Sequence, residues 1–144
     1  MKNIFILILT IYSTLLFSQN KFEYLGTTKN GREIYANYVN SNIYDGVLVQ
    51  YVWVKTIDSP KKVNLKNGKS KTVEGNSTIA LIKYLNYESN NLGPNKYILK
   101  KYTEYNSERK VVDTFDVEDY EEKEKYIIPG TSFSLLENYL SNYK

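Results

Sequence analysis

The sequence contains no cysteine and no histidine, and these two absences exclude several classes of function. A chain without cysteine has no disulfide and no thiolate nucleophile, and a chain without histidine has no imidazole base. Most zinc sites and the common hydrolase triads depend on one of these two residues. We therefore expect a protein that is not an enzyme and that carries no cofactor.

An excess of one charge sign is also lacking, since 19 Lys and Arg stand against 16 Asp and Glu. The resulting net charge of +3 is too small to indicate a nucleic-acid-binding protein. The 144 residues suit one domain rather than two. Tyrosine, by contrast, is abundant with 15 copies, and this content is typical of a folded, β-rich protein.

The first residues have the layout of a secretory signal peptide. A positively charged start precedes an apolar stretch from Ile4 to Phe17, and Ser18 is the small residue at the expected cleavage site. This stretch is too short for a bilayer span, which needs about 20 mostly apolar residues. We predict a signal peptide at 1–18 and one exported domain at 19–144 in the periplasm, at the cell surface or secreted. No stable membrane span remains after cleavage, and an uncleaved anchor is the alternative.

Six segments have the pattern of β-strands, and no helical segment separates them. Asn30-Gly31 predicts a hairpin between the first two strands, and residues 89–95 predict a long turn between the fourth and fifth. The run Val47–Val54 is apolar on both faces, as in a central strand. Strands that follow one another without helices indicate an antiparallel sheet. The six predicted strands are residues 22–27, 32–39, 47–54, 79–87, 96–105 and 110–117.

A single amphipathic helix is predicted at the C-terminus, on the stripe formed by Leu135, Leu136, Tyr139, Leu140 and Tyr143. Its first turn is capped by Ser134 in a capping box with Glu137, or by the earlier Thr131 or Ser132. A helix of about ten residues is about 15 Å long, whereas six strands span about 24 Å, so the helix cannot cover the sheet. The uncovered part must curl on itself, meet a second copy of the chain or present its tyrosines as a partly wet surface. We predict an α+β fold with an about six-stranded, strongly curved antiparallel sheet and one C-terminal helix packed on it.

The segment between Ile57 and Thr78 is basic. It is predicted to be a long, mobile loop or flap because it contains Pro60, Gly68 and Gly75. A solvated surface is the simpler interpretation of such a charged block, since exposed ion pairs contribute only about 0–1 kcal/mol each. The candidate partner-binding residues of this loop are Lys61, Lys62, Lys66, Lys69 and Lys71.

Tyrosines on the sheet provide a second candidate surface. Cross-strand packing, at about 0.2–1 kcal/mol per pair, accounts for most of them. A few are expected on an exposed face, where tyrosine is favoured at protein interfaces. The candidates for this role are Tyr35, Tyr84, Tyr87 and Tyr105.

The acidic segment Asp113–Asp119 is the alternative site. Its carboxylates Asp113, Asp116, Glu118 and Asp119 suggest the acid pair of a hydrolase or a calcium site. The segment lacks the glycine of a helix-flanked calcium loop, and a small sheet with one helix rarely provides the enclosed cleft that raises a carboxyl pKa. We favour an acidic strand edge that discourages aggregation, and expect no catalytic, cofactor-binding or metal-binding residue.

Several short pieces occur in a recognisable order, namely Val52-Trp53-Val54-Lys55, Ile82-Lys83-Tyr84, Lys96-Tyr97-Ile98-Leu99, Lys110-Val111-Val112 and Tyr126-Ile127-Ile128-Pro129-Gly130-Thr131. This order resembles the surface-adhesin protein E family of exported bacterial proteins over about residues 22–143. The resemblance implies a six-stranded antiparallel sheet with a C-terminal helix, no enzymatic activity, binding to host extracellular proteins and dimer formation. Two features depart from the family: the chain lacks its cysteines, and Tyr126 stands where a tryptophan is common.

The leading hypothesis is an exported, non-enzymatic, adhesin-like binding or cell-envelope module. It would contact an unknown protein or another surface macromolecule through the tyrosine-bearing face or the basic loop. The alternatives are a carboxylate-dependent hydrolase or calcium-binding domain that uses Asp113–Asp119, and a structural envelope protein that self-associates. A homodimer is compatible with the first and the last of these hypotheses.

Overall fold

The computed structural model describes residues 21–66, 68–88, 91, 93–117, 122–127 and 131–143. The predicted signal peptide at 1–18 lies outside these residues, as do Glu118 and Asp119 of the acidic segment. No helix in the described part of the chain is long and apolar enough to cross a membrane.

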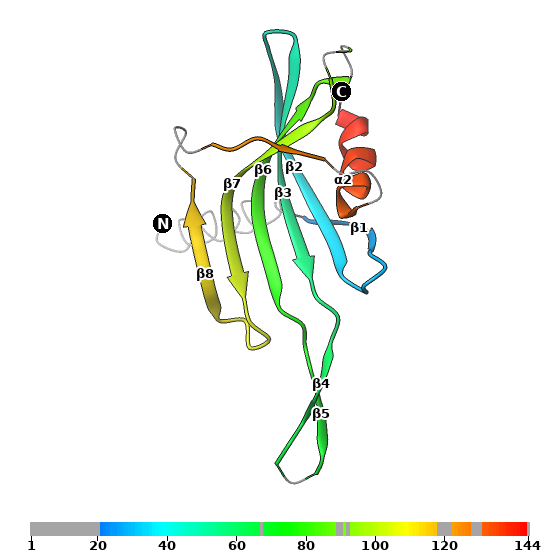
Figure 1. Ribbon diagram of the computed structural model, residues 1–144, viewed down its shortest axis with the longest axis vertical. Coiled ribbons are helices and arrows are strands. Elements are labelled where there is room, and N and C mark those ends of the chain that lie inside the picture. The colour runs from blue at the N-terminus through cyan, green and yellow to red at the C-terminus, as the bar shows by residue number, and fades with distance from the viewer. Residues whose placement is uncertain are drawn as a thin grey trace, which may run out of the picture.

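Most of the described chain forms one antiparallel sheet with strand order β1-β2-β3-β6-β7-β8, and the short β9 pairs with the start of β7 (Figure 1). Its strands are β1 (Glu23–Thr27), β2 (Glu33–Tyr44), β3 (Val47–Ile57), β6 (Ser77–Asn86), β7 (Lys96–Tyr105), β8 (Val111–Asp116) and β9 (Lys125–Tyr126). One C-terminal helix, α2 (Ser132–Leu140), follows and leads into a short 3-10 turn, Ser141–Tyr143. The prediction of an α+β fold built on an antiparallel sheet is confirmed.

The turn between β2 and β3 extends this hairpin beyond the predicted strand ends. Asp45 and Gly46 both have positive φ, at 49° and 79°. This is the backbone that a tight two-residue hairpin turn requires, and Asp-Gly is a favoured pair for it. As a result β2 continues to Tyr44, and β3 lies in the centre of the sheet between β2 and β6 as predicted.

The prediction that the sheet is strongly curved is wrong. The sheet is open, with β1 and β8 as its two edges, and it does not curl back on itself (Figure 1). We call the side turned away from α2 the open face. It carries Tyr51, Tyr87, Lys83 and Lys100, all only partly exposed. Tyrosine rings and lysine stems cover apolar surface while their polar ends stay hydrated, so the open face needs no further curling.

The predicted basic loop is an ordered hairpin, β4 (Lys61–Asn64) and β5 (Ser70–Val73), which forms a two-stranded sheet of its own. It projects from the ends of β3 and β6 (Figure 1). The base of the hairpin is tight, because the Asp58 amide donates to the Asn76 carbonyl at 2.8 Å. A Cβ atom on Gly75 would lie 1.9 Å from the Asp58 carbonyl oxygen, so only glycine fits there.

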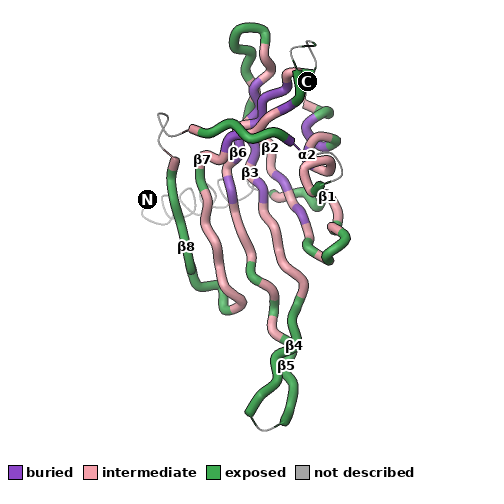
Figure 2. Tube along the Cα trace, in the orientation of Figure 1, coloured by how far each residue is buried: buried purple, intermediate pink, exposed green. Residues whose placement is uncertain are grey.

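The main core lies between α2 and the sheet, and Figure 2 shows the buried segments gathered there. Leu136 and Leu140 point into it and are 2% and 1% exposed, which confirms the predicted apolar stripe. The helix begins earlier than the predicted capping box. Thr131 is the N-cap, and its side chain accepts a hydrogen bond from the Phe133 amide at 3.4 Å, whereas Ser134 lies inside the first turn.

Two tyrosines join the end of the helix to β2. The register of β2 shifts between Tyr38 and Asn40, which marks a β-bulge. The Tyr38 amide donates to the Tyr139 hydroxyl at 3.1 Å, so a side chain of α2 satisfies this backbone group. The ring of Tyr143 stacks on the ring of Tyr38 with centroids 4.1 Å apart.

Candidate functional site

The β4–β5 hairpin brings the five predicted lysines together. Lys61 and Lys62 lie on β4, Lys71 lies on β5, and Lys66 and Lys69 lie near the tip. All five are exposed, and Figure 2 shows the two strands of the hairpin coloured as exposed over nearly their whole length. Between residues 61 and 73 there is no acidic residue, so the hairpin carries five positive charges and no negative one.

Tyr84 does not lie on an exposed face, contrary to the prediction. It is 3% exposed, belongs to the core beneath α2 and donates its hydroxyl to Glu137 at 3.1 Å. Burial, reinforced by the Glu137 carboxylate, raises the pKa of the Tyr84 hydroxyl, so this group remains a hydrogen-bond donor. Tyr84 is therefore removed from the candidate contact surface. The sequence did not reveal this burial, because the strand that carries Tyr84 has apolar residues on both faces.

The other three predicted tyrosines are half-buried and engaged within the molecule. Tyr35 donates its hydroxyl to Glu33 at 2.7 Å, and this bond raises the pKa of the Tyr35 hydroxyl. Tyr87 packs against a small apolar cluster on the open face, and the Lys96 ammonium lies 5.2 Å from the centre of its ring. Tyr105 lines an open hollow of about 580 Å³ beside the base of the basic hairpin. These side chains are spread over the molecule and do not form one continuous patch.

Three charged side chains form a cluster on the open face that the sequence did not predict. Glu122 accepts hydrogen bonds from Lys83, at 3.0 Å, and from Lys100. Partial burial on its own would raise the pKa of Glu122, but the two lysines outweigh it and the net pKa is lowered. Lys83 and Lys100 lie on neighbouring strands, whereas Glu122 follows β8 by several residues. No spacing rule connects the three, so only the folded chain reveals the cluster.

The acidic segment is open to solvent where it is described. Asp113 and Asp116 lie on β8, whose six residues are all exposed, and Asp116 pairs with Lys101 at 2.8 Å. Within the described ranges no group of three or more acidic side chains is placed to hold a metal ion. The two described carboxylates thus have no enclosed cleft around them of the kind that carboxylate catalysis requires.

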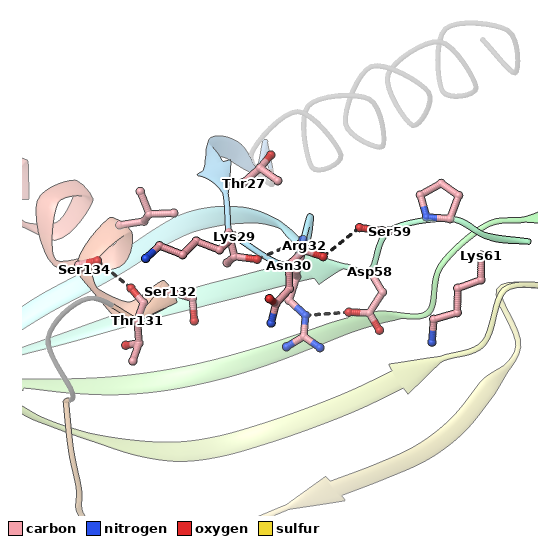
Figure 3. A pocket seen from close by; sticks show the side chains of 13 residues that line it. Thr27, Lys29, Asn30, Arg32, Asp58, Ser59, Lys61, Thr131, Ser132 and Ser134 are labelled. Carbon is pink, nitrogen blue, oxygen red and sulfur yellow. Dashed lines mark hydrogen bonds and ion pairs between the residues drawn. The ribbon is translucent and has the colours of Figure 1, made fainter.

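A larger hollow of about 760 Å³ lies between the β1–β2 turn, the start of β4 and the beginning of α2. Figure 3 shows the Arg32 side chain reaching across it to Asp58, with Nε and Oδ1 2.7 Å apart. Ser59 donates its hydroxyl to the Gly31 carbonyl at 2.7 Å, which ties the hairpin base to the β1–β2 turn. Lys29 and Lys61 also line the hollow and give it an excess of positive charge. Its side chains join the β1–β2 turn to the base of the hairpin.

Comparisons with protein-family models, with curated proteins and with solved structures find no match for this chain.

Proposed function

We propose that this chain is an exported, non-enzymatic binding module, similar in role to an adhesin, that contacts an acidic macromolecule through the β4–β5 hairpin. The projection of this hairpin, with five exposed lysines, is the observation that carries the proposal. Lys61, Lys62, Lys66 and Lys71 form no ion pair with any other described residue. Their charges are therefore available to a partner.

The charge arrangement favours an anionic partner on energetic grounds. Five like charges on two four-residue strands and their turn repel one another, and nothing acidic within residues 61–73 compensates for them. An anionic surface offsets this repulsion, and its electrostatic field attracts the hairpin before the two surfaces touch. Val63 and Leu65, which are 46% and 43% exposed, add apolar contact area between the lysines.

The test measures binding of the purified protein to an immobilised sulfated polysaccharide as the salt concentration rises. We expect affinity to fall at least about tenfold between about 0.05 M and 0.5 M salt, because the Debye length shortens from roughly 14 Å to 4 Å. Replacing Lys61, Lys62, Lys66, Lys69 and Lys71 together by serine should abolish the salt-dependent binding, and replacing them by arginine should preserve it.

A charge-matched control separates the hairpin from net charge. Serine replaces five exposed lysines elsewhere, namely Lys21, Lys29, Lys110, Lys123 and Lys125. This variant has the same net charge as the hairpin variant and should bind nearly as well as the unmodified protein. If both variants lose affinity equally, or if affinity does not fall as the salt concentration rises, the hairpin is not the contact surface.

Self-association through the open face is the second candidate, because a row of apolar side chains lies there uncovered by any described element. Trp53 on β3 is paired with Leu81 on β6, and both side chains are only half-buried. The neighbouring Ile79 extends this row toward the base of the hairpin. Sedimentation of the protein over a range of concentrations tests it, and Leu81→Lys should dissociate any dimer formed this way. A monomer at all concentrations would eliminate this candidate.

A further inference from the structure

A polar hollow of about 310 Å³ lies between the C-terminal half of α2 and the strand ends beside it. It is separate from the basic hairpin, which projects from the opposite ends of the strands (Figure 1). The start of β3, the end of β6 and the residue before β7 contribute to its wall. The lining residues used below are Gln50, Tyr84, Glu88, Asn95, Glu137 and Leu140.

Two side-chain donors of this wall, Tyr84 and Asn95, are already engaged with its carboxylates. Tyr84 donates its hydroxyl to Glu137 at 3.1 Å. The side-chain amide of Asn95 donates to Glu88 and to Glu137, each at 3.2 Å, and its oxygen accepts from the Glu88 backbone amide at 3.1 Å. Since each carboxylate has about four acceptor positions, Glu88 and Glu137 retain capacity to accept further hydrogen bonds. The wall therefore offers acceptors and negative charge.

Gln50 provides an independent indication of a missing donor. Its side chain is fully buried, and its amide nitrogen donates to the Leu140 and Tyr143 carbonyls, both at 3.1 Å. These two bonds fix the orientation of the amide, because the reverse orientation would set its oxygen against two carbonyl oxygens. The oxygen Oε1 is thus turned away from them, and it has no hydrogen-bond partner among the described residues. A buried acceptor without a partner costs about 1–3 kcal/mol, so a ligand that donates to it is favoured.

We propose that this hollow binds a small primary alkylammonium compound, held by Glu88, Glu137 and Gln50. An ammonium group has three donors and no acceptor, which matches a wall of unused acceptors beside two carboxylates. The side chain of Leu140 and the ring of Tyr84 supply apolar contact for a short alkyl chain. Anions are excluded by the two carboxylates. A calcium ion takes six to eight oxygen ligands, and the described chain gathers no group of three acidic side chains.

The first experiment titrates the isotope-labelled protein with n-butylammonium chloride and follows its amide signals by NMR. We expect saturable shifts at the side-chain amides of Gln50 and Asn95, with a dissociation constant in the range of about 1–10 mM. Tetramethylammonium chloride at the same concentration carries the same charge without any N–H donor, and should leave these signals unchanged. Equal responses to both salts, or no shift at Gln50 up to about 50 mM butylammonium, would overturn the proposal.

Variants then assign the contacts. Glu88→Gln and Glu137→Gln keep an acceptor oxygen while removing the charge, and each should weaken butylammonium binding about tenfold. Glu108→Gln on the exposed β7–β8 turn is the matched control and should bind as the unmodified protein does. Unchanged affinity in both hollow variants, each shown by its amide spectrum to be folded, would refute the assignment. A titration with calcium chloride tests the alternative of a metal site. If calcium produces the same shifts at a lower concentration and displaces butylammonium, the hollow is a metal site and the ammonium proposal is refuted.

Discussion

Leu140→Ala tests whether α2 is docked on the sheet as the structure shows. Leu140 is 1% exposed and lies in the core together with Leu136, Val52 and Tyr84. Removal of its buried carbon atoms forfeits their transfer free energy and leaves a cavity, which together cost about 2–5 kcal/mol. A domain of this size has a free energy of unfolding of about 5–15 kcal/mol, so the expected loss is a large share of the total.

Urea unfolding followed by tryptophan fluorescence measures this loss. The chain has a single tryptophan, Trp53, which lies on the open face of β3, so its signal reports the sheet and not the helix. Leu140→Ala should move the unfolding midpoint of the sheet to a lower urea concentration with little change in slope. Leu65→Ala is the control, because Leu65 is 43% exposed on the hairpin and should cost less than about 0.5 kcal/mol.

Docking of α2 requires that the stability of the sheet falls when a helix side chain is removed. A cost for Leu140→Ala below about 1 kcal/mol, comparable with that of Leu65→Ala, would mean that the helix contributes no packing at this position. A helical signal that melts separately from the Trp53 signal would likewise show that α2 and the sheet are not one cooperative unit.

Two further predictions concern polar contacts. Tyr139→Phe should destabilise the protein by about 1–3 kcal/mol in the same urea assay, because the Tyr38 amide at the β-bulge loses its acceptor; a cost near zero would show that water replaces the hydroxyl. Because the pKa of Glu122 is lowered in the folded state from its ordinary value of 4.5, the stability it adds is present above that pH and lost as the pH falls below it. Between about pH 6 and pH 3 the free energy of unfolding should therefore fall less for Glu122→Gln than for the unmodified protein. Parallel profiles of unfolding free energy against pH would contradict the stabilising role of the Glu122 charge.

The strands could be read from the sequence because their signals are local. Alternation in β2 predicts Ile34 and Ala36 on a buried face, and both are at most 2% exposed. The run Val47–Val54, apolar on both faces, predicts the central strand that the structure contains. The Asn30-Gly31 turn is likewise present, with Gly31 at a φ of 76°. Each of these features depends on neighbouring residues alone.

The features that the sequence did not predict depend on contacts between distant residues. Tyr84 was an interface candidate because its strand pattern does not say which face α2 covers, and the helix begins far along the chain, at Ser132. Strong curvature was one of three outcomes that the short helix allowed, and the structure has another, in which tyrosine rings and lysine stems cover part of the open face. The segment at 61–73 has glycine and charge, which favour a loop, yet continuation of β3 and β6 brings its two halves into register.

The β4–β5 hairpin owes its order to the strands that lead into it and not to a core of its own. An isolated two-stranded hairpin is marginally stable at best. All four residues of β4 are exposed, and the core beneath α2 contains no residue of the hairpin. All five lysines are exposed, and their like charges repel one another. Since folding and the proposed contact use different residues, loss of binding after lysine substitution would report the contact itself, with the fold intact.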